Sequence, residues 1–186
     1  MNPTITTRMA NLRDRMAATA TDLVVIGPSS HMLYLADLAP HGDERPVLLM
    51  VSPTFAGLLM PSLNVDSSRQ HTDLPFFPWA DADGPDAALA ELLNATGVPT
   101  APSIVLDETM RADFALLVLD ALPGATRRFT SDTVGYLRSR KDDAEYDALK
   151  KSAVLNDAAM AAGFAALRPG ITEREIATVI RDFYKA

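Results

Sequence analysis

Short runs of continuous apolar residues constrain the fold of this chain more than any other feature of its sequence. The three clearest runs are Asp22 to Ile26, Pro46 to Val51 and Ile104 to Leu106, and Gly27-Pro28 ends the first. A strand with apolar side chains on both faces is buried on both faces, because a half-exposed strand would show an alternating pattern. The runs therefore predict a sheet with helices on each side.

Helical patterns lie between these runs and supply the covering layers. Helices are predicted over residues 4–19, 85–95 and 110–122, and a final edge strand over residues 127–130. Within the first helix, apolar residues recur at helical spacing at Ile5, Met9, Leu12 and Met16. Strands that alternate with helices favour an α/β domain. Residues 54–79 are irregular and interrupted by proline, so no elements are predicted there.

The pattern changes after Ser131, where two capped helices follow one another. Asp142-x-x-Glu145 and Thr172-x-x-Glu175 are capping boxes. In a capping box the side chain of the first residue accepts from the backbone N–H of the fourth, and the side chain of the fourth accepts from the backbone N–H of the first. The first helix is predicted to reach about residue 167, with one apolar face made by Tyr146, Leu149, Ala153, Met160, Phe164 and Leu167. The second carries an apolar stripe of Ile176, Val179, Ile180 and Phe183.

The second helix is still running at Ala186, and its stripe needs a surface to cover it. We expect the chain to be the front part of a larger protein. In the chain as given, the tail must fold back, pair with the tail of another chain, or fray. We expect pairing between chains, because burying one large apolar side chain contributes roughly 1.5–3 kcal/mol.

Composition narrows the class of protein. The net charge of −7 disfavours a nucleic-acid partner or an anionic membrane surface, which would require a basic patch. The chain has no cysteine, and no run approaches the length of a transmembrane helix. The N-terminus lacks the apolar segment of a signal peptide. We expect a cytoplasmic protein without nucleic acid or membrane as a partner.

A complete catalytic site is not predicted within these residues. The three histidines, His31, His41 and His71, do not form the His-x-x-x-His spacing of a helical zinc site. No phosphate-binding glycine loop or Gly-x-Ser-x-Gly elbow occurs. We therefore predict no catalytic residue and no metal ligand in this chain.

The junction and tail resemble one protein family. The matching residues are Tyr136-Leu137-Arg138, Lys141, Glu145, Leu149-Lys150-Lys151-Ser152-Ala153 and Leu167-Arg168-Pro169-Gly170-Ile171-Thr172-Glu173. Upstream, Ser29 to Leu35 and Leu106-Asp107-Glu108 with Ala121-Leu122-Pro123 fit as well. Together they are similar to the pita-bread metallopeptidases: Xaa-Pro dipeptidase (prolidase), aminopeptidase P and creatinase.

This resemblance implies a domain organisation. It implies a creatinase/prolidase N-terminal-like domain over residues 1–135, a three-layer, ribonuclease H-like α/β fold with a mixed sheet flanked by helices. Residues 136–186 would be a linker and the first two helices of a truncated catalytic pita-bread domain.

The resemblance also implies a function. The full-length protein would be a hydrolase acting on proline-containing peptides as a homodimer. Two divalent ions of the manganese or cobalt type would sit among two Asp, one His and two Glu, all outside this chain. The chain alone would bind no cofactor and would be inactive, contributing dimerisation and access to the active site. Two alternatives stay open: an amidinohydrolase resembling creatinase, and a stand-alone module for peptide binding or dimerisation.

Substrate-access candidates follow from the same resemblance, which places loops of this domain over the partner subunit's active site. The candidate loop contains Asp37, His41, Glu44 and Arg45. Arg45 could bind a carboxylate through two hydrogen bonds, or simply form a structural contact with an acidic neighbour. Asp37 stands where the family usually has glycine, which leaves the local backbone open.

Two further residues depart from or extend this pattern. Trp79 is the only tryptophan, either an aromatic that reaches a neighbouring subunit or, as we favour, a partly buried anchor. His31 replaces the usual asparagine of the family, and we expect a structural role for it.

Overall fold

The computed structural model describes residues 3–185, which form two compact units that divide between Ser139 and Arg140. The first unit contains a six-stranded mixed sheet in the order β4-β3-β2-β1-β5-β6. Its strands are β1 (Leu23–Ile26), β2 (Leu48–Val51), β3 (Ala56–Pro61), β4 (Phe76–Trp79), β5 (Ser103–Leu106) and β6 (Thr126–Phe129). β1, β5 and β6 run parallel, β2 is antiparallel to both neighbours, and β3 pairs parallel with β4.

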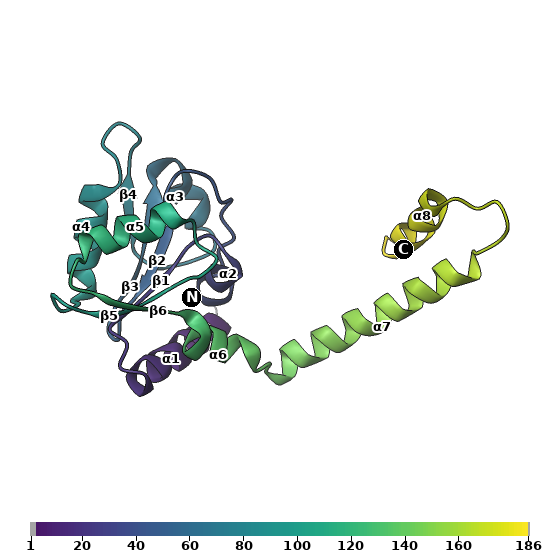
Figure 1. The fold of residues 1–186 in the computed structure, drawn as a ribbon, viewed down its shortest axis with the longest axis horizontal. Coiled ribbons are helices and arrows are strands. Elements are labelled where there is room, and N and C mark those ends of the chain that lie inside the picture. Colours follow the sequence, from purple (N-terminus) through teal and green to yellow (C-terminus); the bar gives the residue numbers. More distant parts are fainter. Residues whose placement is uncertain (1–2, 186) are drawn as a thin grey trace. The chain divides into compact units, whose positions relative to one another are not determined.

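The sheet lies between two layers of helices (Figure 1). The helices of this unit are α1 (Pro3–Ala18), α2 (Ser30–Ala36), α3 (Ser62–Ser68), α4 (Asp86–Thr96), α5 (Ala112–Ala121) and α6 (Val134–Ser139), with a short 3-10 turn η1 (Thr130–Asp132) before α6. The predicted α/β architecture with helices on both faces is confirmed.

Alternating residues of the central strands point to opposite faces and feed two separate cores. Val24 and Ile26 of β1 join the core under α1, α2, α3 and α6. Leu23 and Val25 join the core under α4 and α5. All four residues are fully buried, which is why the run carries no polar alternation.

The predicted elements occur close to their expected positions. The first helix, the strands after Asp22 and before Ser52, and the helices near residues 85–95 and 110–122 are all present, with ends shifted by a few residues. Residues 54–79, for which no elements were predicted, form β3, α3 and β4. The helix α2, which begins where Ser29 accepts a hydrogen bond from the His31 backbone N–H, was also not predicted.

The second unit is a pair of helices, α7 (Asp143–Ala165) and α8 (Glu173–Phe183). Both predicted capping boxes are present, at Asp142 with Glu145 and at Thr172 with Glu175. α8 packs on α7 of its own chain, and a side chain at Gly163 would fall 2.8 Å from Ile180 Cγ1. Tyr184 adds a hydrogen bond to Asn156 at 2.8 Å.

The small residues of α7, and not its predicted apolar face, receive α8. Ala159 and Gly163 are the residues of α7 that are buried. Phe164 and Leu167, which the sequence placed on the packing face, are 66% and 55% exposed. The reason is close approach: the branched side chains of Ile176 and Ile180 fit against a glycine, whereas a phenylalanine there would hold the helices apart.

Within residues 3–185, no helix is both long enough and apolar enough to cross a membrane.

Candidate functional site

The loop of residues 37–46 begins where α2 ends. Asp37 caps the C-terminus of α2 with φ 57° and donates its backbone N–H to the Leu33 carbonyl. This left-handed conformation is the one that glycine adopts without strain. The aspartate therefore takes the backbone conformation suited to glycine, and its presence requires no different turn.

Asp37 also borders a pocket of about 430 Å³ between the loop and α3. His71, which the sequence did not single out, lines the same pocket together with Asn64 and Ser67. Asp37 and His71 are both exposed. The pocket therefore has a mixed polar and apolar lining, since Leu33 and Pro40 also border it, and it is open to solvent.

Arg45, at the other end of the loop, is held by Asp81. Its Nε and Nη2 donate to the two carboxylate oxygens of Asp81 at 3.0 and 2.8 Å. The hydrogen bond to Asp81, and then its charge, raise the pKa of Arg45. The predicted acidic contact of Arg45 thus exists, but its partner lies 36 positions away instead of in the adjacent Glu44.

Trp79 lies beside this pair and is 7% exposed. Its indole Nε1–H donates to the Pro46 carbonyl at 3.1 Å, and Ser62 Oγ donates to the Trp79 carbonyl at 3.0 Å. This is the geometry of a buried anchor that fixes the end of the loop to β4.

The structure brings some of the predicted site residues together. At one end of the loop, Arg45 donates to Asp81, and Trp79 donates to Pro46, the residue after Arg45. Asp37 lies at the other end, and His41 and Glu44 are exposed between the two. The loop is therefore anchored at both ends and open to solvent along its middle.

A polar cluster lies where β1 and β5 end. Arg138 Nη1 lies 2.9 Å from His31 Nδ1. Asp107 accepts from Ser29 Oγ at 2.6 Å and from the N–H and hydroxyl of Thr109 at 2.9 and 2.6 Å. His31 and Asp107 are 6% and 3% exposed, so the cluster is largely shielded from water.

Glu108 forms the outer part of this cluster. It accepts hydrogen bonds from the backbone N–H and hydroxyl of Thr130 at 3.2 and 2.8 Å. Burial acts to raise the pKa of Glu108, but hydrogen bonds from its own backbone and from Thr130 outweigh it, and the pKa is lowered.

His31, Asp107 and Glu108 are also the described residues most suited to a metal ion, since one ligand atom from each lies within 4.8 Å of the others. Their hydrogen bonds oppose that role. Ser29 and Thr109 each donate to one oxygen of Asp107, and the hydroxyl and the backbone N–H of Thr130 can donate to Oε1 and Oε2 of Glu108. The set also does not fit the two Asp, one His and two Glu that the resemblance implies for a dinuclear centre. We read the cluster as structural.

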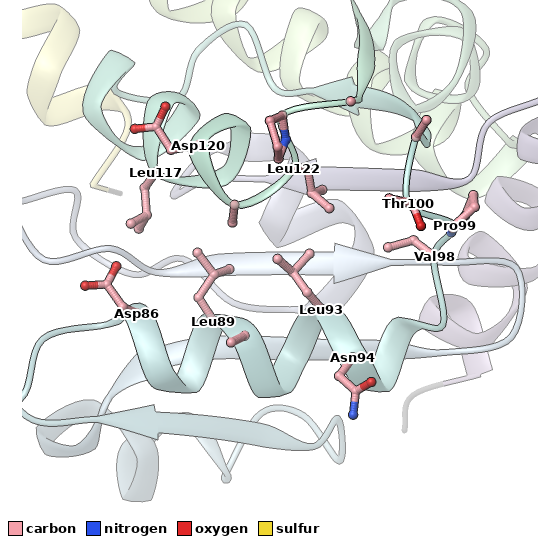
Figure 2. A pocket seen from close by; sticks show the side chains of 15 residues that line it. Asp86, Leu89, Leu93, Asn94, Val98, Pro99, Thr100, Leu117, Asp120 and Leu122 are labelled. Atoms are coloured by element: carbon pink, nitrogen blue, oxygen red, sulfur yellow. The ribbon is translucent and has the colours of Figure 1, made fainter.

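A groove of about 860 Å³ runs between α4 and α5 (Figure 2). Leu89 and Leu93 line it from α4, Leu117 and Leu122 from the opposite side, and Asp86 and Asp120 lie toward one end. Leu89 is 2% exposed, and Leu93 and Leu122 are each 9% exposed. These three leucines are part of the domain core, so the apolar surface that the groove presents comes mainly from partly buried residues such as Leu117 and Val98.

Comparison with known proteins places these features in context. The family model described as the creatinase/prolidase N-terminal domain matches residues 8–139. A probable dipeptidase PepE of Mycobacterium tuberculosis is 28% identical over 164 residues, covering 86% of this chain and 42% of that protein. A creatinase of a Bacillus species is 29% identical over 178 residues, covering 93% of this chain and 43% of that protein.

Among solved structures, the dipeptidase PepE of Mycobacterium ulcerans matches with a TM-score of 0.85 and 25% identity. That match covers 97% of this chain and 48% of the other, so it includes α7 and α8 as well as the matched domain. The chain spans less than half the length of these curated relatives.

Proposed function

The chain belongs to the creatinase/prolidase N-terminal domain family, and from that premise we propose that it is the N-terminal portion of a metal-dependent Xaa-Pro dipeptidase or aminopeptidase. In this proposal residues 1–135 form the family domain, and residues 136–186 are the linker and first helices of a catalytic domain. The observation that carries the proposal is the likeness to PepE, which continues past residue 139 through α7 and α8.

The chemistry is assigned to residues outside this chain. Two divalent ions of the manganese or cobalt type, held by residues outside this chain, would supply an activated water and an electrostatic partner for the charge that develops at the scissile carbonyl. Residues 3–185 contain no cluster that fits such a centre. The part of the protein described by the structure would therefore support the active site without supplying its ligands.

The loop of residues 37–46 is the part we assign to substrate access. It is anchored at Asp37 and at Arg45 and exposed at His41 and Glu44. Anchored ends fix the position of a loop, while exposed polar side chains in its middle remain free to meet a peptide. In the full-length protein, His41→Ala should therefore raise KM with little effect on Tm. Equal losses of Tm and activity with KM unchanged would give His41 a structural role instead.

Dimerisation is the second role that we assign, and in the full-length protein we assign it to the N-terminal domain. In the chain as given we expect a further association through α7, because its exposed apolar side chains, which include Leu149 and Phe164, would otherwise be covered by a catalytic domain. Light scattering should therefore give residues 1–186 a higher state of association than residues 1–139. The same state of association for both proteins would exclude association through α7 and α8.

A second candidate is an amidinohydrolase related to creatinase. The Bacillus creatinase is 29% identical to this chain and the mycobacterial dipeptidase 28%, so identity favours neither reading. The third possibility is a module for peptide binding or dimerisation without catalysis. The residues of this chain fit that module as well as they fit the two enzymes.

The reading frame beyond codon 186 separates these possibilities. A continuing frame that encodes two Asp, one His and two Glu in ligand order supports the peptidase, and a stop codon supports the module. The full-length product should then be loaded with manganese or cobalt and assayed with a Xaa-Pro dipeptide and with creatine. Release of proline supports the first reading, and release of urea from creatine supports the second.

A further inference from the structure

His31 and Arg138 meet although they are 107 positions apart in the chain. His31 lies in the first turn of α2, and Arg138 lies near the end of α6. A guanidinium has only donors, so the contact of 2.9 Å between Arg138 Nη1 and His31 Nδ1 requires the ring nitrogen to accept. The ring is therefore neutral, with its proton on Nε2.

Carboxylates also face the same ring. Asp107 and Glu108, which follow β5, each bring an oxygen within 4.8 Å of a His31 ring nitrogen. Asp107, Arg138 and Glu108 are the ionisable groups that act on the ring from the elements packed around it. Ser29, Thr109 and Thr130 hold the two carboxylates by hydrogen bonds, so the carboxylates keep their places when the ring changes charge.

We propose that His31 is a proton-operated latch for α6, which holds Arg138 when its ring is neutral and releases Arg138 in favour of Asp107 and Glu108 when its ring is protonated. A protonated imidazole carries a proton on both nitrogens, so Nδ1 can no longer accept. The protonated ring would then direct an N–H donor at the Arg138 guanidinium, which has no acceptor. The positive charge of the ring would also repel that of the guanidinium. The fixed carboxylates stabilise the imidazolium that results.

The pH range of the latch follows from the environment of the ring. Burial lowers the pKa of His31 below 6.5, Asp107 acts in the opposite direction, and Arg138 lowers it further. Between this lowered pKa and 6.5 the unfolded chain binds more protons than the folded one, so stability falls as the pH falls through that range. Above pH 6.5 the ring is neutral in both states and the latch is closed.

The position of α6 gives the latch a consequence. Arg138 lies just before the division between the two compact units, after Ser139. Release of Arg138 removes a contact that fixes the last helix of the first unit. Mild acid should therefore loosen the segment that joins this domain to the residues after it, whatever reaction the full-length protein catalyses.

The test uses residues 1–186 with His41→Asn and His71→Asn, which leaves His31 as the only histidine. Imidazole ¹⁵N spectra at pH 8 should show the Nε2–H form. The Leu137 amide, which donates to the Thr133 carbonyl, should lose about tenfold of its exchange protection between pH 7.5 and the pH at which the same spectra show His31 to be protonated, after correction for the intrinsic rate. A tenfold change in the equilibrium constant is about the smallest effect expected from losing a hydrogen bond to a charged group. The amide of Val25 in β1 serves as the internal reference.

His31→Asn in the same background is the matched control. Asparagine places an amide oxygen where Nδ1 lies, so it can still accept from Arg138, but it does not titrate in this range. The Leu137 protection should then stay constant. The latch is overturned by an Nδ1–H form at pH 8, by constant protection in the protein with His31 alone, or by an undiminished pH response in His31→Asn. If His31→Asn does not fold, the first two results still decide.

Discussion

The two units of this protein bury their apolar side chains to very different degrees. In the first, adjacent residues of the central strands lie in two separate cores, and Leu12 and Leu49 are fully buried. In the second, Ala159 and Gly163 are the residues of α7 and α8 that are buried, and Leu149 is 54% exposed. A capped helix with regular spacing is therefore not enough for a core, because a second surface must cover its apolar face.

The two units also differ in how the N-termini of their helices are capped. Within residues 3–185, the two fully formed capping boxes lie in the second unit, at Asp142 and Thr172. In the first unit, α4 and α5 begin without a side-chain cap. Helices that are packed against a sheet obtain their stability from burial, whereas exposed helices depend more on their ends.

The largest expected difference is the cost of losing a leucine. Leu12→Ala removes a fully buried side chain from the first unit and should lower the free energy of unfolding by about 2–5 kcal/mol. Leu149→Ala removes an exposed one and should change it by less than about 0.5 kcal/mol. Urea unfolding followed by fluorescence of Trp79, which lies in the first unit, measures the first value. Circular dichroism follows the helices of both. Equal costs would remove the contrast between the units.

The contact between α7 and α8 is the next largest. Gly163→Leu places a side chain where Ile180 lies 2.8 Å away and should destabilise the helix pair by about 1–3 kcal/mol. Ala161→Leu adds a similar side chain at an exposed position of the same helix and should be neutral. Hydrogen exchange of the α8 amides measures both, and equal protection in the two variants would mean that α8 does not depend on Gly163.

The two units should lose stability at different pH values. All three histidines lie in the first unit, and the lowered pKa of His31 makes its stability fall as the pH drops below 6.5. The second unit contains no histidine. Its Glu175 has a pKa lowered by hydrogen bonds from the Thr172 backbone and side chain, so that stabilising contribution is lost only below about pH 4.5. Far-UV dichroism and amide exchange at pH 7.5, 5.5 and 3.5 should show the two losses in that order.

The smallest expected effect concerns backbone conformation. Ala20 has φ 48° in the first unit, whereas the second unit places Gly170 at φ 87°. Relief of left-handed strain should make Ala20→Gly stabilising by up to about 1 kcal/mol, and Gly170→Ala should destabilise the α7–α8 turn by a similar amount. Thermal unfolding of both variants measures the pair. Opposite signs would show that the loss of chain entropy outweighs strain at these positions.

Local patterns in the sequence predicted local structure well. The run after Asp22 and the stripe of Ile5, Met9, Leu12 and Met16 gave a buried strand and a covering helix in the right places. The same reasoning missed β3, because Gly57 and Pro61 leave only Leu58 to Met60 as a continuous apolar run within Ala56 to Pro61. Glycine and proline are typical of turns, so this segment was not recognised as a buried strand, although the uninterrupted run of β1 was.

Contacts distant in sequence were beyond prediction. The loop that contains Arg45 could be chosen from its charges and from the family resemblance, but its partner Asp81 comes into reach only when β4 pairs with β3. His31 and Arg138 are likewise joined by the path of the chain around the sheet. Spacing within one segment carries no information on such pairs.

The two edge strands of the sheet oppose self-association through strand addition. An edge strand with free backbone groups is a template on which a strand from another molecule can add. Here β4 carries Pro78, which has no N–H to donate, and β6 carries the exposed Arg127, whose charge opposes the approach of a like strand. The domain should thus resist strand-by-strand aggregation, including while the chain is still being synthesised and the residues after it have not yet folded.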